Sequence, residues 1–218
     1  MNDVKCHGRI VAVGLVCLFN VLRYFYYHQY LALPFKANFF VITFIFLMIA
    51  LWCGRQYDRM QYLSEKDPLT DTYNRRTVEQ YFQKILQARK KENQKLGIIM
   101  IDLNKFKEIN DTYGHHTGDE LLSHFAVMLK KTVQKNDRVA RWGGDEFLIL
   151  VPDIAEDYET VYVRNLQLSI DGFPSISASL GFAIYPDDGE NFQELLQHAD
   201  RAMYEAKGTV LEKLKVGI

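Results

Sequence analysis

Two uninterrupted apolar stretches occupy the first third of the chain. Residues 10–22 contain one polar side chain, Asn20, and residues 39–53, with the sequence FFVITFIFLMIALWC, contain no charge. A helix needs about 20 predominantly apolar residues to cross a bilayer, so the second stretch is just long enough when its two preceding residues are counted. The first stretch is short unless it continues past Arg23, whose guanidinium would then reach the interface. We therefore interpret residues 1–53 as a membrane anchor with two helical spans, or one as the alternative.

The charged residues around these stretches predict the orientation of the anchor. Lys5 and Arg9 precede the first stretch, and Arg55 and Arg59 follow the second. Because positive residues collect on the cytoplasmic side, a two-span hairpin would keep both of its ends in the cytoplasm. A cleaved signal peptide is the alternative for the first stretch, but residues 20–23, Asn-Val-Leu-Arg, offer no small-residue cleavage site.

Residues 54–66 separate the anchor from the rest of the chain. Their sequence, GRQYDRMQYLSEK, has no proline and places Tyr57 and Met60 near one helical face. It predicts a short helical stalk that continues the second span, with a solvated linker as the alternative. The pattern changes at Asp67, so residues 67–218 are expected to form a separate domain.

From Asp67 onward the apolar periodicity alternates between that of helices and that of strands. The first two predicted elements are a helix capped by Asn74 and the strand LGIIMIDL, residues 96–103. They are followed by a second helix over residues 122–133, a hairpin of strands 139–142 and 146–151, a half-buried strand over residues 176–182 and a last helix over residues 195–206. Gly143 and Gly144 indicate the hairpin, because glycine tolerates the positive φ angles of such turns. Helices interleaved with a mixed sheet imply an α/β layer architecture.

Three acidic residues lie where this architecture would bring them together. Asp102 sits at the end of the buried strand, and Asp145 and Glu146 follow the glycine turn. Taken singly, each has an ordinary interpretation as an exposed hairpin charge or a strand-ending cap. If the hairpin pairs beside the strand, the three like charges destabilise one another unless a divalent cation neutralises them. Oxygen ligands favour Mg²⁺ or Mn²⁺, and such sites suit phosphoryl or nucleotidyl transfer.

Charge and cysteine content exclude several other classes of site. The net charge of −1 gives no indication of nucleic-acid binding. Cys6, Cys17 and Cys53 all lie in or beside the membrane segment, so they predict neither a disulfide framework nor a zinc site. The domain after residue 67 has no cysteine, which suits a reducing cytosol.

Five sequence blocks, in order along the chain, resemble the GGDEF family of diguanylate cyclases. They are DPLTDTYNRR from Asp67, DLNKFKEINDTYGHHTGDELL from Asp102, RWGGDEF from Arg141, SASLGFA from Ser177 and ADRAMYEAK from Ala199. The resemblance implies an α/β sandwich related to the palm of nucleotide cyclases and polymerases. It also implies a bacterial enzyme that condenses two GTP into cyclic di-GMP in a two-fold homodimer, here held on the cytoplasmic face of the membrane.

The resemblance implies roles for the acidic residues and their neighbours. Asp102, Asp145 and the backbone carbonyl of Leu103 match the metal ligands. Glu146 would bind a second metal or help to deprotonate the attacking 3′-hydroxyl. With Lys107, which contacts phosphate in the family, Asp145 and Glu146 would be the catalytic residues.

Further residues match the family's substrate-binding positions. Asn110 and Asp119 occupy the guanine-reading positions, and a carboxylate suits guanine because it can accept from N1–H and N2–H₂. Lys207 matches a second phosphate-contacting lysine, and Phe106 is expected to pack under the phosphate loop. Gly143 and Gly144 would let the backbone approach the nucleotide closely.

The sequence departs from the family pattern at four places, of which the first is Thr72, where a leucine is common. Val210 and Leu211 replace the glycine and the phosphate-binding arginine expected after Lys207. The segment 148–178 is shorter than usual. Gln134 replaces the arginine of the inhibitory RxxD motif, so the inhibitory site for cyclic di-GMP is expected to be absent. These losses keep open the alternative of a weak or inactive GTP-binding module that acts through a partner.

Overall fold

The computed structural model describes residues 6–31, 37–154 and 177–216, with side chains as far as Lys207. The chain divides into two compact units, Met1–Ser64 and Glu65–Ile218.

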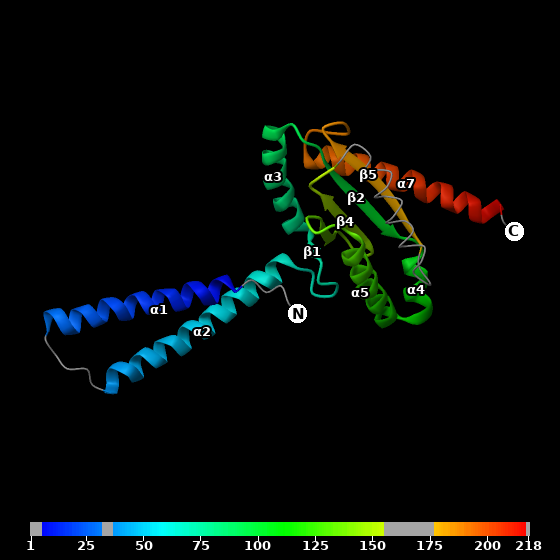
Figure 1. Ribbon diagram of the computed structural model, residues 1–218. Coiled ribbons are helices and arrows are strands. Elements are labelled where there is room, and N and C mark those ends of the chain that lie inside the picture. Colours follow the sequence, from blue (N-terminus) through cyan, green and yellow to red (C-terminus); the bar gives the residue numbers. More distant parts are fainter. Residues whose placement is uncertain (1–5, 32–36, 155–176, 217–218) are drawn as a thin grey trace. The chain divides into compact units, whose positions relative to one another are not determined.

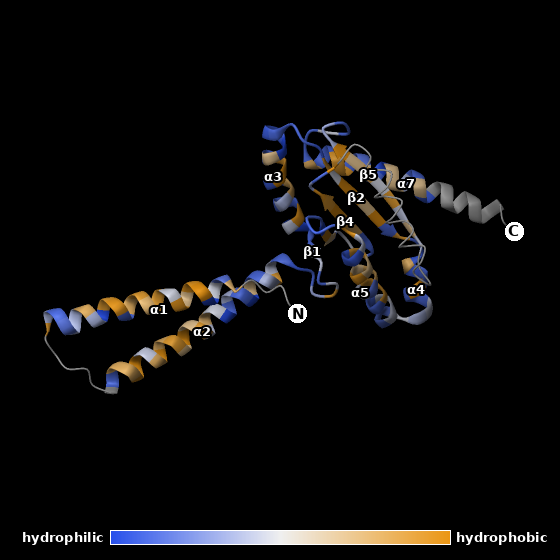
Figure 2. Ribbon diagram, in the orientation of Figure 1, coloured by the Kyte–Doolittle hydropathy of each residue, from blue (hydrophilic) through white to orange (hydrophobic). Residues whose placement is uncertain are grey.

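The first unit is built from two long helices, α1 (His7–Phe25) and α2 (Ala37–Glu65), whose surfaces are largely apolar (Figures 1 and 2). A short π-helical turn, η1 (Tyr26–Tyr30), extends α1. By length and composition, His7–Tyr30 and Asn38–Glu65 are both able to cross a membrane. The second helix runs without a break through the residues expected to form the stalk.

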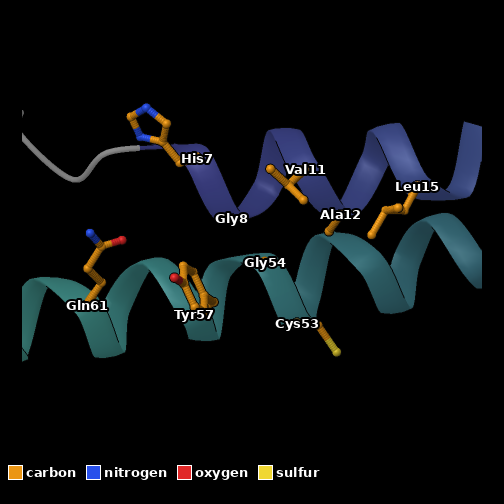
Figure 3. A pocket seen from close by; sticks show the side chains of 9 residues that line it. All are labelled: His7, Gly8, Val11, Ala12, Leu15, Cys53, Gly54, Tyr57 and Gln61. Atoms are coloured by element: carbon orange, nitrogen blue, oxygen red, sulfur yellow. The ribbon is translucent and has the colours of Figure 1, made fainter.

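Polar contacts tie the two helices together near both ends of the pair. The Asp58 carboxylate accepts hydrogen bonds from the Gly8 backbone N–H at 2.7 Å and from Arg9 Nε at 2.9 Å. At the other end Arg23 Nη2 donates to the Phe39 carbonyl at 2.7 Å. A cavity of about 590 Å³ lies between the helices. Figure 3 shows the residues that line it, which are His7, Gly8, Val11, Ala12, Leu15, Cys53, Gly54, Tyr57 and Gln61. None of these residues belongs to the predicted catalytic set.

The second unit is an α/β sandwich around a mixed five-stranded sheet. The strand order is β1 (Tyr73–Asn74), β3 (Arg138–Arg141), β4 (Glu146–Val151), β2 (Leu96–Leu103) and β5 (Ala178–Tyr185). Only the β1–β3 pair is parallel among these neighbours. The helices are α3 (Arg75–Glu92), α4 (Phe106–Tyr113), α5 (His115–Thr132) and α7 (Phe192–Val216) (Figure 1).

Alternate residues of β2 face two separate hydrophobic clusters, one on each side of the sheet. Ile99 and Ile101 pack in a cluster with Phe125 of α5. Ile98 and Met100 pack in a second cluster, which contains buried residues of α3 and α7. Because both faces of β2 are covered, the whole strand is buried, as its continuous apolar sequence predicts.

The predicted order of helices and strands is confirmed, including the cap at Asn74, whose Oδ1 accepts from the Thr77 N–H at 3.0 Å. Two expectations were wrong in detail. Gly114, not Gly143 or Gly144, is the one described glycine with a positive φ, so the hairpin turn forms without the backbone conformation expected of it. In addition, a separate helix, α4, precedes α5.

The strand β5 is also more enclosed than its alternating sequence predicted. Leu180 and Phe182 pack against one hydrophobic cluster, while Ala183 belongs to the other. The face with Ser179, Gly181 and Ala183 is therefore buried, and Leu180 and Phe182 on the other face are partly buried. Ile176, expected at its start, lies outside the described residues.

Candidate active site

Asp102 and Glu146 are direct cross-strand neighbours, because β2 and β4 pair in antiparallel register at these two residues. The Leu103 N–H donates to the Asp145 carbonyl at 3.3 Å and so joins the end of β2 to the hairpin turn. On the other side of β2, Asp102 pairs with Ser179 of β5. The sheet therefore brings the end of the buried strand and the acidic turn together, as the sequence predicted.

Glu146 is partly buried among other acidic groups. Burial raises the pKa of Glu146 above its usual value, and the charges of Asp102, Asp145 and Asp200 raise it further. Lys207 acts in the opposite direction. Like charges at short range favour the protonated carboxyl, so a cation among them would relieve this repulsion.

Lys207, on α7, forms an ion pair with the nearly buried carboxylate of Asp102. The distance between Lys207 Nζ and Asp102 Oδ1 is 2.6 Å, and 13% of the Asp102 side chain is exposed. The helix can lie this close because Gly181 of β5 has no side chain. A Cβ at that position would overlap the Ala199 carbonyl oxygen and lie 2.5 Å from the Met203 nitrogen.

These carboxylates fit a divalent cation that shares its coordination with a substrate. No group of three metal-ligating side chains is already assembled among the residues that the structure describes. Mg²⁺, however, is usually held by one or two carboxylates together with waters and substrate phosphates. Asp102 and Asp145 are therefore sufficient in kind, and the oxygen-only donor set favours Mg²⁺ or Mn²⁺.

Arg141 holds the turn between β3 and β4. Its Nη2 donates to the Gly144 carbonyl at 2.8 Å, its Nε donates to the Gly143 carbonyl at 3.2 Å, and its Nη1 pairs with Asp67 at 3.2 Å. In the sequence, Arg141 and Asp67 belong to two separate blocks, and the sequence alone assigned neither residue a role. Asp200 was missed in the same way, because only the folded sheet brings its charge close to Glu146.

Asn110 and Gly118 lie against each other where α4 packs on α5. The Oδ1 atom of Asn110 is buried and has no hydrogen-bond partner within the described chain. Gly118 is buried, and a Cβ built on it would overlap Asn110 Oδ1 and lie 3.1 Å from Phe106 Cζ. Asp119, the next residue, is exposed.

The remaining predicted site residues differ in how far they are enclosed. Lys107 and Gly144 are exposed, and a Cβ at Gly144 would meet nothing within 4 Å. A Cβ at Gly143 would instead lie 2.6 Å from the carboxylate of Glu146. The side chain of Leu211 and residues 155–176 lie outside the described part of the chain.

Comparison with protein families gives one match that covers most of the chain. The family described as "Diguanylate cyclase, GGDEF domain" matches residues 64–211. This range contains all of the residues predicted for the site.

Individual relatives give the same result. The diguanylate cyclase DgcM of Escherichia coli K12 is 34% identical over 162 residues, which cover 70% of this chain and 38% of DgcM. The bifunctional diguanylate cyclase/cyclic di-GMP phosphodiesterase MucR of Pseudomonas aeruginosa is 36% identical over 153 residues, which cover 66% of this chain and 22% of MucR. The chain thus spans well under half the length of these relatives.

A solved structure matches over the same domain. The GGDEF domain of TpbB, also called YfiN, from Pseudomonas aeruginosa has a TM-score of 0.62 and 34% sequence identity. The match covers 66% of this chain and 89% of that structure.

Proposed function

Because the chain belongs to the GGDEF-domain diguanylate cyclase family, we propose that it condenses two GTP molecules into cyclic di-GMP and two pyrophosphates. The observation that best supports this proposal is the cross-strand pairing of Asp102 with Glu146, directly beside Asp145. Lys207 adds a positive charge to the same place, where substrate phosphates would need it.

The carboxylates would bind the metal, and the lysines would bind the substrate phosphates. Asp102, Asp145 and the Leu103 carbonyl would hold Mg²⁺, which when bound stabilises the pyrophosphate and lowers the pKa of the attacking hydroxyl. Lys207 and Lys107 would bind the phosphates. Lys207 Nζ lies 2.6 Å from Asp102 Oδ1, and this contact uses one of its three N–H donors and leaves the others for phosphate oxygens.

Glu146 is suited to take a proton from the attacking 3′-hydroxyl. Its pKa is raised by burial and by neighbouring acids, which makes it a stronger base than an exposed glutamate. Coordination of a second metal is the other role for the same carboxylate. Gly143 and Gly144 would keep the turn close to the nucleotide, and the open space at Gly144 leaves room for it.

The guanine base would be read by Asn110 and Asp119, and Phe106 would pack under the phosphate loop. Guanine presents the N1–H and N2–H₂ donors together, whereas the adenine edge offers no such pair. The exposed carboxylate on Asp119 is a group that these donors can satisfy.

One domain of this kind would hold one GTP, so the reaction requires a homodimer in which each 3′-hydroxyl faces the partner's α-phosphate. We infer that residues 1–53 anchor the chain in the bacterial cytoplasmic membrane and that residues 54–66 form the stalk. The catalytic domain, residues 67–218, would then face the cytoplasm. Confinement to the membrane raises the effective concentration of the two domains.

The test is to supply the full chain, in membranes, with GTP and Mg²⁺ and to identify the products by mass spectrometry. Cyclic di-GMP from the native chain but not from Asp145→Asn is the expected result. GTP binding without product would instead support the alternative, a catalytically inactive GTP-binding module that acts through a partner. The reason for this alternative is that Val210 and Leu211 replace the glycine and the phosphate-binding arginine expected after Lys207.

A further inference from the structure

Gly118 makes a space that the Asn110 side chain fills, and we call this space the Gly118 slot. It lies between the backbone of Gly118 on α5 and the side chains of Asn110 and Phe106 on α4. A Cβ on Gly118 would overlap Asn110 Oδ1 and would lie 3.0 Å from its Cγ. The steric conflict is the same whichever of the two amide atoms occupies that point. Any residue other than glycine would therefore move the Asn110 amide.

The slot is not explained by helix stability. Glycine in a helix interior costs about 1 kcal/mol relative to alanine, and Gly118 is the fourth residue of α5, with a φ outside the positive range. The slot also leaves Asn110 Oδ1 buried with no partner in the described chain, which is unfavourable in itself. The glycine and the unpaired oxygen both lower the free energy of unfolding. We therefore infer that the position of the Asn110 amide serves a purpose other than folding.

The position of the slot indicates what it serves. Asp119, the second residue assigned to the purine base, directly follows Gly118 on α5, while Asn110 belongs to α4. The contact at Gly118 is therefore where the two helices that carry the base-reading groups meet. It sets the position of the Asn110 amide relative to the Asp119 carboxylate.

We propose that Gly118 is a positioning residue that determines specificity. Because it has no side chain, the Asn110 amide can occupy the position from which it and Asp119 together bind a guanine base. This inference rests on the proposed function and adds to it a residue that does not itself touch the nucleotide. The atom in conflict is the end of a flexible side chain, so Gly118→Ala can be accommodated by rotation of Asn110 rather than by unfolding. Specificity should then change much more than stability.

The experiment is a double-mutant cycle on the full chain in membranes, with Gly118→Ala and Asn110→Ala made singly and together. The readouts are KM and kcat for GTP, and the preference for GTP over ITP, which lacks the exocyclic 2-amino group. With Asn110 present, Gly118→Ala should raise KM for GTP by about three- to tenfold, the range for one lost hydrogen bond. It should also reduce the GTP-to-ITP preference and leave kcat less affected.

The same substitution made in the Asn110→Ala background is the matched control. There Gly118→Ala should change KM by less than about twofold, because no amide remains to be displaced. The thermal midpoint in that background should stay level or rise, since alanine favours the helix. An equal rise in KM in both backgrounds would show a purely structural role and overturn the proposal.

Two further outcomes are also decisive. An unchanged KM and GTP-to-ITP preference in Gly118→Ala, with the native chain fully active, would overturn the positioning role alone. A native chain that neither binds nor converts GTP would overturn the proposed function, and this inference with it. The two failures are therefore distinguishable in one set of assays.

Discussion

Asp102 is nearly buried, and its carboxylate forms an ion pair with Lys207 of α7, which is distant in the sequence. It is 9% exposed and ends a strand whose other residues are almost all apolar. Such a residue is costly to keep in a sheet unless its charge is used. In the proposed function that carboxylate would bind a cation, and Lys207 beside it would bind phosphates.

We predict that Asp102→Ala and Asp145→Ala each reduce cyclic di-GMP synthesis by about a hundredfold or more, the scale for losing one preorganised electrostatic contact. Initial rates with GTP and Mg²⁺ test this. Asp187→Ala is the matched control, because Asp187 is exposed and follows β5 at the end opposite Ser179, where it pairs with Lys95. Near-normal rates in either active-site variant would remove that residue from the metal site.

Glu146 gives a prediction for pH. Its pKa in the folded protein is raised from the usual 4.5, so the folded state binds more protons than the unfolded chain between the two pKa values. Without metal, the free energy of unfolding should fall as the pH rises from about 4.5 through the folded pKa. Denaturant unfolding of residues 65–218 in EDTA, across this range, measures the effect. Glu146→Gln should remove that part of the pH dependence, and an unchanged profile in the variant would contradict the assignment.

At the scale of elements, the sequence predicted the helices and strands whose formation depends on a pattern of neighbouring residues. The continuous apolar run of β2 requires cover on both faces, and the structure has it. The cap at Asn74 is likewise a local interaction. The helix α4 was missed although Phe106, Ile109 and Tyr113 lie at helical spacing, because it has only 8 residues and only Gly114 separates it from α5.

The parts of the site that escaped prediction depend on contacts between elements far apart in sequence. Arg141 was visible as the residue before Trp142, but its pairing with Asp67 joins two blocks that lie on different elements. The charge of Asp200 reaches Glu146 only after α7 packs on the sheet. Periodicity and spacing along the chain carry no information about such distances.

The packing of α7 on β5 gives a prediction at this scale. In Gly181→Ala the new methyl group would meet backbone atoms of Ala199 and Met203, which cannot rotate away. We expect a loss of about 1–3 kcal/mol in the free energy of unfolding, as for other overpacked sites, measured by urea denaturation. Gly118→Ala is the comparison, because there the obstructing atom is a movable side-chain end. Equal stability of the two variants would contradict this account of the α7 contact.

At the scale of the whole molecule, residues 134–137, which precede the hairpin, determine whether cyclic di-GMP can inhibit its own synthesis. Asp137 is buried, and its Oδ2 accepts a hydrogen bond from the Gln134 N–H at 2.7 Å, so this carboxylate holds the local turn. Gln134 lacks the fixed charge and the forked donors by which arginine binds a phosphate or stacks on a base. The product should therefore bind poorly at this position.

We predict that synthesis continues at cyclic di-GMP concentrations that silence relatives with an intact RxxD motif. Initial rates against added cyclic di-GMP test this, with Gln134→Arg measured in parallel. The variant should gain sensitivity to the product if the rest of the site is intact. Strong non-competitive inhibition of the native chain would show the prediction to be wrong.

The stoichiometry of the reaction tests the central claim most directly. Full-length protein in membranes is given GTP and Mg²⁺, and GTP, pyrophosphate and cyclic di-GMP are quantified over the same interval. The account predicts two GTP consumed and two pyrophosphates released for each cyclic di-GMP formed. Tight GTP binding with no cyclic di-GMP, at enzyme concentrations that permit dimerisation, would contradict it.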